Sequence, residues 1–143
     1  MTNKIVIMNS MASERPRPTE SELSILRVLW DNGPLPVRAV MKTLNDKKQS
    51  AEKPIGYTNV LKVMQIMTDK GLVERDESCR PQIYRPRDPQ AKTQRQLLRH
   101  MLDRVFGGST RAMVLEALSE KKTSPQELKQ IEKLLDRIEG EKK

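Results

Sequence analysis

Apolar residues recur at helical spacing through most of this chain of 143 residues, and this pattern limits the fold more than any other feature. Side chains three or four positions apart share one face of a helix, so such stripes predict amphipathic helices. The pattern changes to alternation only in two short segments, 72–75 and 82–85, which we expect to pair as a hairpin. The sequence therefore predicts a mainly α protein with one small β-hairpin.

Local patterns set the bounds of three helices before the hairpin. Thr19 and Glu22 form a capping-box pattern, which predicts a helix over residues 20–31. Apolar spacing predicts a second helix over residues 37–45 and a third over about residues 57–70. Three helices followed by a hairpin is the order of a winged helix-turn-helix domain.

The C-terminal part carries three further amphipathic stripes. They predict a helix over about residues 89–106, a short helix after Ser109 and a last helix after Ser124. Such short helices bury their apolar stripes poorly alone, so we expect a second copy of the chain to cover them, as a homodimer. The residues assigned to this dimerisation surface are Leu97, Leu98, Met101, Leu102, Val105, Phe106, Met113, Val114, Leu118, Leu128, Ile131, Leu134 and Leu135.

These patterns divide the chain into three parts. Residues 1–18 show no period and contain the run Arg-Pro-Arg-Pro, so we expect a disordered arm. A basic arm that contacts phosphate is the alternative for this part. Residues 19–87 are expected to form the winged-helix DNA-binding domain, and residues 88–143 the helical dimerisation domain.

The chain is strongly basic, with 27 Lys and Arg against 19 Asp and Glu and a net charge of +8. Residues 1–111 hold this whole excess, because acids and bases balance in residues 112–143. Basic proteins are attracted to polyanions, and nucleic acid is the commonest such partner. We therefore expect a polyanion-binding surface in the N-terminal part.

Other classes of function find little support in the sequence. Cys79 is the single cysteine and His100 the single histidine, so neither an intrachain disulfide nor a zinc site is expected. The chain has no Gly-rich phosphate loop or nucleophile motif, which predicts no enzyme, no metal and no cofactor. The cysteine count is typical of the cytoplasm, and no apolar run reaches the about 20 residues of a membrane helix. A redox switch at Cys79 is the alternative to an incidental surface cysteine.

The helix expected at residues 57–70 has one apolar and one polar face. Hydroxyl, amide and ammonium groups contact base edges and phosphates when a recognition helix enters the major groove, while arginines of the hairpin would contact the backbone. The DNA-binding residues predicted in this way are Tyr57, Thr58, Asn59, Lys62, Gln65, Arg75, Arg80 and Arg85. Tyr57 would give its hydroxyl to a phosphate. The alternatives are an ordinary solvated helix face and an ion pair of Arg75 with Glu74 or Asp76.

Several motifs, taken in order, resemble those of the penicillinase repressor family. They are PTESELSIL at 18–26, YTNVLKVM at 57–64, KGLVER at 70–75, YRP at 84–86, VFGG at 105–108 and MVL at 113–115. The resemblance covers about residues 19–138 and implies a homodimeric repressor that binds an inverted-repeat operator in double-stranded DNA. It places Thr58, Asn59 and Lys62 toward the groove. It also implies that a membrane receptor-protease relieves repression by cutting the C-terminal domain.

The chain departs from the family pattern in four respects, one of which is a loop over residues 46–53 that is longer than in several members. Asn59 stands where many members carry Thr, and Ile66 where a basic residue is frequent, which predicts a different operator. The copper-responsive branch uses C-terminal Cys-x-Cys pairs, and this chain has none, so metal sensing is not expected. The alternative to a repressor is a winged-helix adaptor that binds protein and no operator. Steep salt dependence of DNA binding would separate the two.

Overall fold

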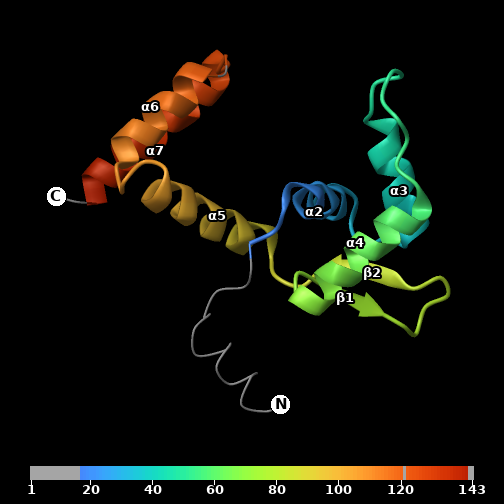
Figure 1. Ribbon diagram of the computed structural model, residues 1–143. Coiled ribbons are helices and arrows are strands. Elements are labelled where there is room, and N and C mark those ends of the chain that lie inside the picture. Colours follow the sequence, from blue (N-terminus) through green and yellow to red (C-terminus); the bar gives the residue numbers. More distant parts are fainter. Residues whose placement is uncertain (1–16, 121, 142–143) are drawn as a thin grey trace, which may run out of the picture. The chain divides into compact units, whose positions relative to one another are not determined.

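The computed structural model describes residues 17–120 and 122–141 (Figure 1). Within these residues it confirms a mainly α protein with one antiparallel hairpin. The elements, in chain order, are α2 (Glu20–Asn32), α3 (Val37–Asp46), α4 (Tyr57–Lys70), β1 (Val73–Asp76), β2 (Ile83–Pro86), α5 (Gln90–Arg104), α6 (Thr110–Glu120) and α7 (Pro125–Glu141).

The chain forms two compact units, Met1–Leu97 and Leu98–Lys143, which we call the N-terminal and C-terminal units. The predicted division into residues 19–87 and 88–143 concerns separate domains and stays a prediction. The predicted disordered arm, residues 1–18, lies outside the described residues except for Arg17 and Pro18.

Helix α2 begins where the sequence predicts and extends one residue further, to Asn32. The Thr19 hydroxyl accepts a hydrogen bond from the Glu22 backbone N–H at 3.2 Å, and the Glu22 carboxylate accepts one from the Thr19 N–H at 2.9 Å. This is the predicted capping box, which satisfies N–H groups that the first turn leaves without helical partners. Gly33 ends the helix with φ at 85°, a backbone conformation that favours glycine.

The core of the N-terminal unit lies between α2, α3, α4 and the hairpin. Each helix contributes the apolar stripe of its sequence. The buried apolar side chains are Ile25, Leu26, Val28, Leu29, Val37, Val40, Val60, Met64, Met67, Leu72, Val73 and Tyr84. Trp30 is partly buried and packs against this core. Because burying one such side chain is worth about 1.5–3 kcal/mol, this core holds α4 firmly in place.

The hairpin starts one residue later than predicted on each strand, at Val73 and Ile83. The reason lies at the end of α4, where Gly71 adopts the left-handed conformation with φ at 81°. The Leu72 N–H donates to the Met67 carbonyl at 2.9 Å, so Leu72 completes the helix cap instead of opening the strand.

A backbone bridge fixes the hairpin to the segment between α2 and α3. Leu35 and Tyr84 exchange two hydrogen bonds, of 3.1 Å from the Leu35 N–H and 2.9 Å from the Tyr84 N–H. Tyr84, a residue of β2, is also buried in the core and is only 1% exposed. Backbone hydrogen bonds and the buried Tyr84 side chain therefore hold the hairpin beside the start of α3.

The loop between α3 and α4 is closed by one side chain. The Asn45 amide donates to the Ile55 carbonyl at 3.1 Å, and its oxygen accepts from the Ile55 N–H at 2.8 Å. These bonds join the end of α3 to the residue just before the Gly56 cap of α4. They fix the point at which α4 begins.

An ion pair that the sequence does not suggest joins α2 to α4. Lys70, the last residue of α4, lies 2.6 Å from the carboxylate of Glu22, whose residue is 3% exposed. Burial raises the pKa of the Glu22 carboxyl, but hydrogen bonds from Lys70 and Thr19 outweigh it and hold that pKa below its ordinary value. Glu22 thus serves both as the capping-box residue and as the anchor of Lys70.

In the C-terminal unit, α5 ends at Arg104, two residues before its predicted end. The Gly108 N–H donates to the Leu102 carbonyl at 2.8 Å and closes the helix early. The Ser109 and Ser124 hydroxyls accept from backbone N–H groups near the starts of α6 and α7, each at 3.1 Å. None of the helices in the described ranges is long and apolar enough to cross a bilayer.

Candidate nucleic-acid interface

Helix α4 has one buried and one exposed face. Val60, Met64 and Met67 are at most 2% exposed and pack into the core. The predicted DNA-binding residues of this helix all lie at the surface: Tyr57, Thr58, Asn59, Lys62 and Gln65. The structure therefore brings the five side chains to the surface of one helix, and their contacts with DNA stay a prediction.

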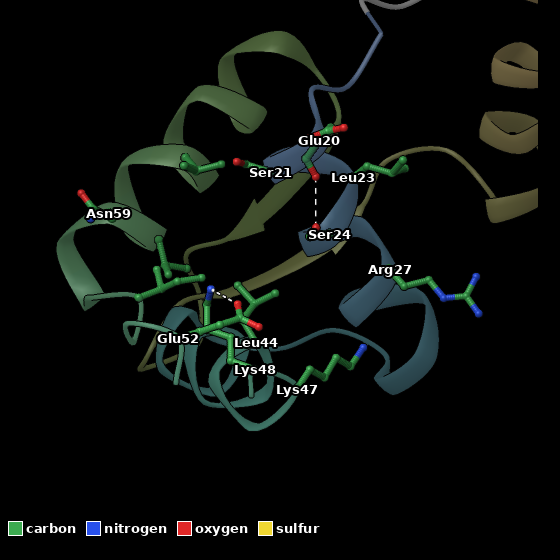
Figure 2. A pocket seen from close by; sticks show the side chains of 13 residues that line it. Glu20, Ser21, Leu23, Ser24, Arg27, Leu44, Lys47, Lys48, Glu52 and Asn59 are labelled. Atoms are coloured by element: carbon green, nitrogen blue, oxygen red, sulfur yellow. Dashed lines mark hydrogen bonds and ion pairs between the residues drawn. The ribbon is translucent and has the colours of Figure 1, made fainter. Parts of the chain in front are cut away.

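Asn59 lies on the flank of α4 that faces α2. It lines a hollow of about 860 Å³, together with residues of α2, the end of α3 and the loop that follows (Figure 2). Figure 2 shows the labelled Glu20 and Ser21 on α2 and Lys48 and Glu52 below them. The Lys48 ammonium pairs with Glu52 at 3.3 Å, so this hollow holds both acids and bases.

Tyr57 lies on the other flank of α4, beside α3 and the hairpin. With Arg38 and Lys42 of α3 and Arg80 of the hairpin, it lines a second hollow of about 780 Å³, which we call the basic groove. The guanidinium carbon of Arg38 is 5.1 Å from the centroid of the Tyr57 ring, a cation–π contact. The basic groove therefore lies at the N-terminal end of α4, where a recognition helix enters DNA.

Sequence reasoning missed Arg38 and Lys42. Both are basic and four residues apart, so they share one face of α3, and this spacing could have suggested a charged stripe. The stripe becomes informative only once the fold places α3 against α4 and the hairpin. In the described part of the chain, neither residue has a carboxylate within ion-pair distance.

The hairpin arginines have different surroundings. Arg75 donates to the Glu77 carboxylate from Nη2 at 2.8 Å and from Nε at 3.1 Å. Its partner is therefore Glu77, and not Glu74 or Asp76, which the sequence offered as alternatives. Glu77 lies two residues on, past the strand end, where the chain turns back toward Arg75. Hydrogen bonds with Tyr84 and with Glu77 raise the pKa of the Arg75 guanidinium. Arg75 is thus held within the hairpin.

Arg85 and Arg80 are less constrained than Arg75. Arg85 is exposed and lies directly across the hairpin from Glu74. Arg80 is exposed, lies in the turn between the strands and borders the basic groove. Of the three predicted hairpin residues, Arg80 is therefore the one that the structure brings next to the start of α4.

The tip of the hairpin is organised around Asp76. Its carboxylate accepts hydrogen bonds from the backbone and the hydroxyl of Ser78, and these bonds hold the pKa of Asp76 below its ordinary value. The Cys79 thiol is 3.8 Å from the same carboxylate and is half-buried. Among the residues that the structure describes, no cluster of His, Cys, Asp and Glu could hold a metal ion.

Apart from Leu97, the last residue of the N-terminal unit, the predicted dimerisation residues lie in the C-terminal unit, which buries little of its apolar surface. Among the described residues of the C-terminal unit, none is buried. On α5, Leu98 is 52% exposed and Met101 is 50% exposed. Val105, which directly follows the helix, is 68% exposed. The other exposed members are Val114, Leu128, Leu134 and Leu135. The half-buried members are Leu97, Leu102, Phe106, Met113, Leu118 and Ile131.

Two exposed apolar residues of this unit were absent from the predicted set. Leu115 on α6 is 49% exposed and Ile138 on α7 is 39% exposed. Both could have been found from the sequence, because Ile138 follows Leu134 at helical spacing and Leu115 precedes Leu118 at helical spacing. They enlarge the apolar surface that a partner would cover.

Comparison with known proteins identifies the family of the chain. The profile of the family described as penicillinase repressor matches residues 18–137, which is most of the chain. The penicillinase repressor of Bacillus licheniformis is 23% identical over 128 residues, which cover 90% of this chain and 96% of that protein. The chain therefore belongs to the penicillinase repressor family, a family of DNA-binding transcriptional repressors.

Proposed function

We propose that the protein is a homodimeric repressor that binds an inverted-repeat operator in double-stranded DNA. The observation that carries this proposal is the exposed face of α4. Its opposite face is held in the core by Val60, Met64 and Met67, so the polar side chains are presented on a rigid element. Membership of a repressor family supports the same conclusion.

The side chains of α4 suit the reading of base edges. The amides of Asn59 and Gln65 have the geometry to pair with adenine, Lys62 can reach guanine, and the methyl group of Thr58 can contact thymine. Arg80 and Arg85 would contact the phosphate backbone beside the groove. Because Arg75 is paired with Glu77, it contributes less net charge to DNA than the other two.

The exposed apolar surface of the C-terminal unit supports the dimer. Large exposed apolar surfaces on a soluble domain mark contacts with partners, and a repressor that binds a symmetric site needs a second copy. We propose that α5, α6 and α7 form this contact through the residues named above. The two recognition helices would then be about 34 Å apart, which is one turn of DNA, or a multiple of that distance.

We further propose that a membrane receptor-protease relieves repression in the cytoplasm by cutting the C-terminal part. This idea comes from the family resemblance. The exposed turn at Gly107 and Gly108, with φ of 57° and 84°, supports it, because exposed turns are the preferred sites of proteolytic cleavage. Cleavage there would separate α5 from α6 and α7 and weaken the dimer.

Selection from a randomised duplex library, followed by footprinting of the enriched site, tests the proposal. We expect an inverted repeat with two protected half-sites and an affinity that falls steeply as salt rises, because phosphate neutralisation releases counterions. No protected site, or binding to DNA that is indifferent to both sequence and salt, would contradict it. That result would favour a winged-helix adaptor that binds protein.

A further inference from the structure

The basic groove brings together three cationic side chains from separate parts of the N-terminal unit. Arg38 and Lys42 come from α3, and Arg80 comes from the turn of the hairpin. The other polar groups that line it belong to Tyr57, Gln82 and Tyr84, and no carboxylate lines it in the described part of the chain. Like charges gathered without a counter-charge repel one another, so such a groove is suited to an anion.

The hollow on the opposite flank of α4 provides an internal comparison. It has a similar size and also carries basic residues, but Glu20 and Glu52 line it as well. Arg27 in that hollow lies 3.4 Å from Asp31, and Lys48 pairs with Glu52 (Figure 2). The two flanks of α4 therefore differ in the balance of charge, and the unbalanced one lies beside the hairpin.

We propose that the basic groove is a phosphate subsite, in which Arg38 and Arg80 hold one backbone phosphate from two sides. The ligand is a phosphodiester of the operator, so this inference rests on the proposed function and adds a contact to it. Because Tyr57 begins α4, the phosphate held in the groove flanks the first base that α4 reaches. The subsite would thus set how far α4 enters the major groove.

Tyr57 acts in this subsite as a positioning residue. Its ring lies under the guanidinium of Arg38 at 5.1 Å, and such a contact restricts a side chain that would otherwise sample many rotamers. The ring, and not the hydroxyl, is then the part of Tyr57 that matters. This differs from the expectation that the hydroxyl itself binds phosphate.

The test uses the full-length protein and its selected operator. Arg38→Ala should weaken binding by about tenfold or more and lower the slope of log affinity against log salt by about one per protomer. Arg27→Ala removes the same charge from the other flank of α4 and should leave both quantities unchanged. Equal affinity and equal slope for Arg38→Ala and the wild type would overturn the subsite.

Two variants of Tyr57 separate the ring from the hydroxyl. Tyr57→Phe should retain the affinity and the salt slope of the wild type, whereas Tyr57→Leu should lose about threefold in affinity. In the double variant with Arg38→Ala, the loss from Tyr57→Leu should disappear, because the residue that the ring positions is gone. Additive losses, or a large loss with Tyr57→Phe, would refute the positioning role.

Operators with single methylphosphonate substitutions identify the source of the phosphate. One neutral position in each half-site should weaken the wild type and have no further effect on Arg38→Ala. Inorganic phosphate, exchanged for chloride at constant ionic strength, provides the other arm. If it displaces operator from the wild type but not from Arg38→Ala, the ion and the operator compete for the groove, as the proposal expects. If the ion binds through Arg38 while no methylphosphonate position weakens the wild type, the groove binds the free ion alone, and the proposal of a backbone phosphate is wrong.

These outcomes are distinct from a failure of the proposed function. If the wild type binds no operator at all, the repressor assignment itself fails. If the wild type binds its operator while the Arg38 variants, the salt slopes and the methylphosphonate scan show no groove contact, only the subsite fails.

Discussion

At the residue scale, side chains on the two flanks of α4 are expected to make different contacts with DNA. Asn59 lies on α4 with its amide at the surface, whereas Arg80 lies in the turn of the hairpin. Base edges carry sequence information and phosphates do not. Substitutions at the two positions should therefore change DNA binding in different ways.

Asn59→Ala should relax base preference at one position of each half-site, at a cost of about 1–3 kcal/mol for the preferred operator. Competitive binding to a randomised operator library measures this change. Arg80→Ala is the comparison, and it should weaken all sequences alike while reducing the salt slope. Identical preference profiles for the wild type and Asn59→Ala would show that Asn59 does not read a base.

The ion pair of Glu22 and Lys70 leads to a prediction about stability. Glu22→Gln should lower the free energy of unfolding by about 1–3 kcal/mol at neutral pH, because a buried charge-assisted hydrogen bond is lost. Lys70→Met should cost at least as much, since it leaves the Glu22 carboxylate buried without its partner. Denaturant unfolding measures both, and Lys48→Met, at the more exposed pair with Glu52, should change little.

The same carboxyl predicts the direction of a pH effect. Its pKa is lowered in the folded protein, so its contribution to stability is present above the ordinary Glu pKa and is lost as the pH falls through the folded value. The wild type should therefore lose its advantage over Glu22→Gln in acid. A difference in unfolding free energy between the two proteins that stays constant from neutral to strongly acidic pH would contradict this account.

At the element scale, the sequence was sufficient for most helix bounds and insufficient for the contacts between helices. Capping residues and glycines act within a few positions, which explains why α2 and α4 were predicted within one residue. The hairpin was displaced by one residue because Leu72 completes the cap of α4, a choice between two local structures that the apolar pattern alone does not decide. Existence and type of an element are thus easier to predict than its first residue.

In the candidate site too, features set by nearby residues could be predicted, and contacts between elements could not. The polar face of α4 follows from helical spacing alone, and five side chains could be named for that reason. Arg38 was missed because its contact with Tyr57 joins residues that are distant in sequence, and only the fold brings α3 beside α4. Glu77 was not among the alternative partners named for Arg75, because the turn of the hairpin, which carries Glu77, follows no simple period.

The closed loop between α3 and α4 gives a prediction at this scale. Asn45→Ala removes both hydrogen bonds to the Ile55 backbone, and we expect a loss of about 1–2 kcal/mol in unfolding free energy. Hydrogen exchange should also become faster at the start of α4, where these bonds fix the chain. Thr43→Ala, which removes a hydroxyl that bonds only within α3, is the control and should leave that exchange unchanged. Unaltered exchange in Asn45→Ala would show that the loop does not hold α4.

At the scale of the whole molecule, we propose that one unit binds DNA and the other pairs the two copies. The N-terminal unit has the buried core and carries α4, while the C-terminal unit exposes its apolar side chains. A charge placed in that apolar surface should separate the copies without unfolding the N-terminal unit. This follows because the described residues of the C-terminal unit contribute nothing to the buried core.

Met101→Lys should shift the protein from dimer to monomer, as measured by sedimentation, because a lysine in an apolar contact loses its hydration. Asp103→Asn makes the same change in net charge on the other side of α5 by helical spacing, and it should remain dimeric. Operator affinity should fall with Met101→Lys and persist in the control. A fully dimeric Met101→Lys protein would show that the contact lies elsewhere.

The backbone bridge between Leu35 and Tyr84 has a consequence for how the proposed repressor would dissociate from DNA. The bridge ties β2 to the segment just before α3, so the hairpin and the start of α3, which carries Arg38, are held together while the N-terminal unit stays folded. Release of DNA by movement of the hairpin away from α3 within one protomer is therefore disfavoured. In the proposed dimer, release would instead follow separation of the two protomers. This raises the off-rate, because one N-terminal unit alone loses the high local concentration that its linked partner supplies.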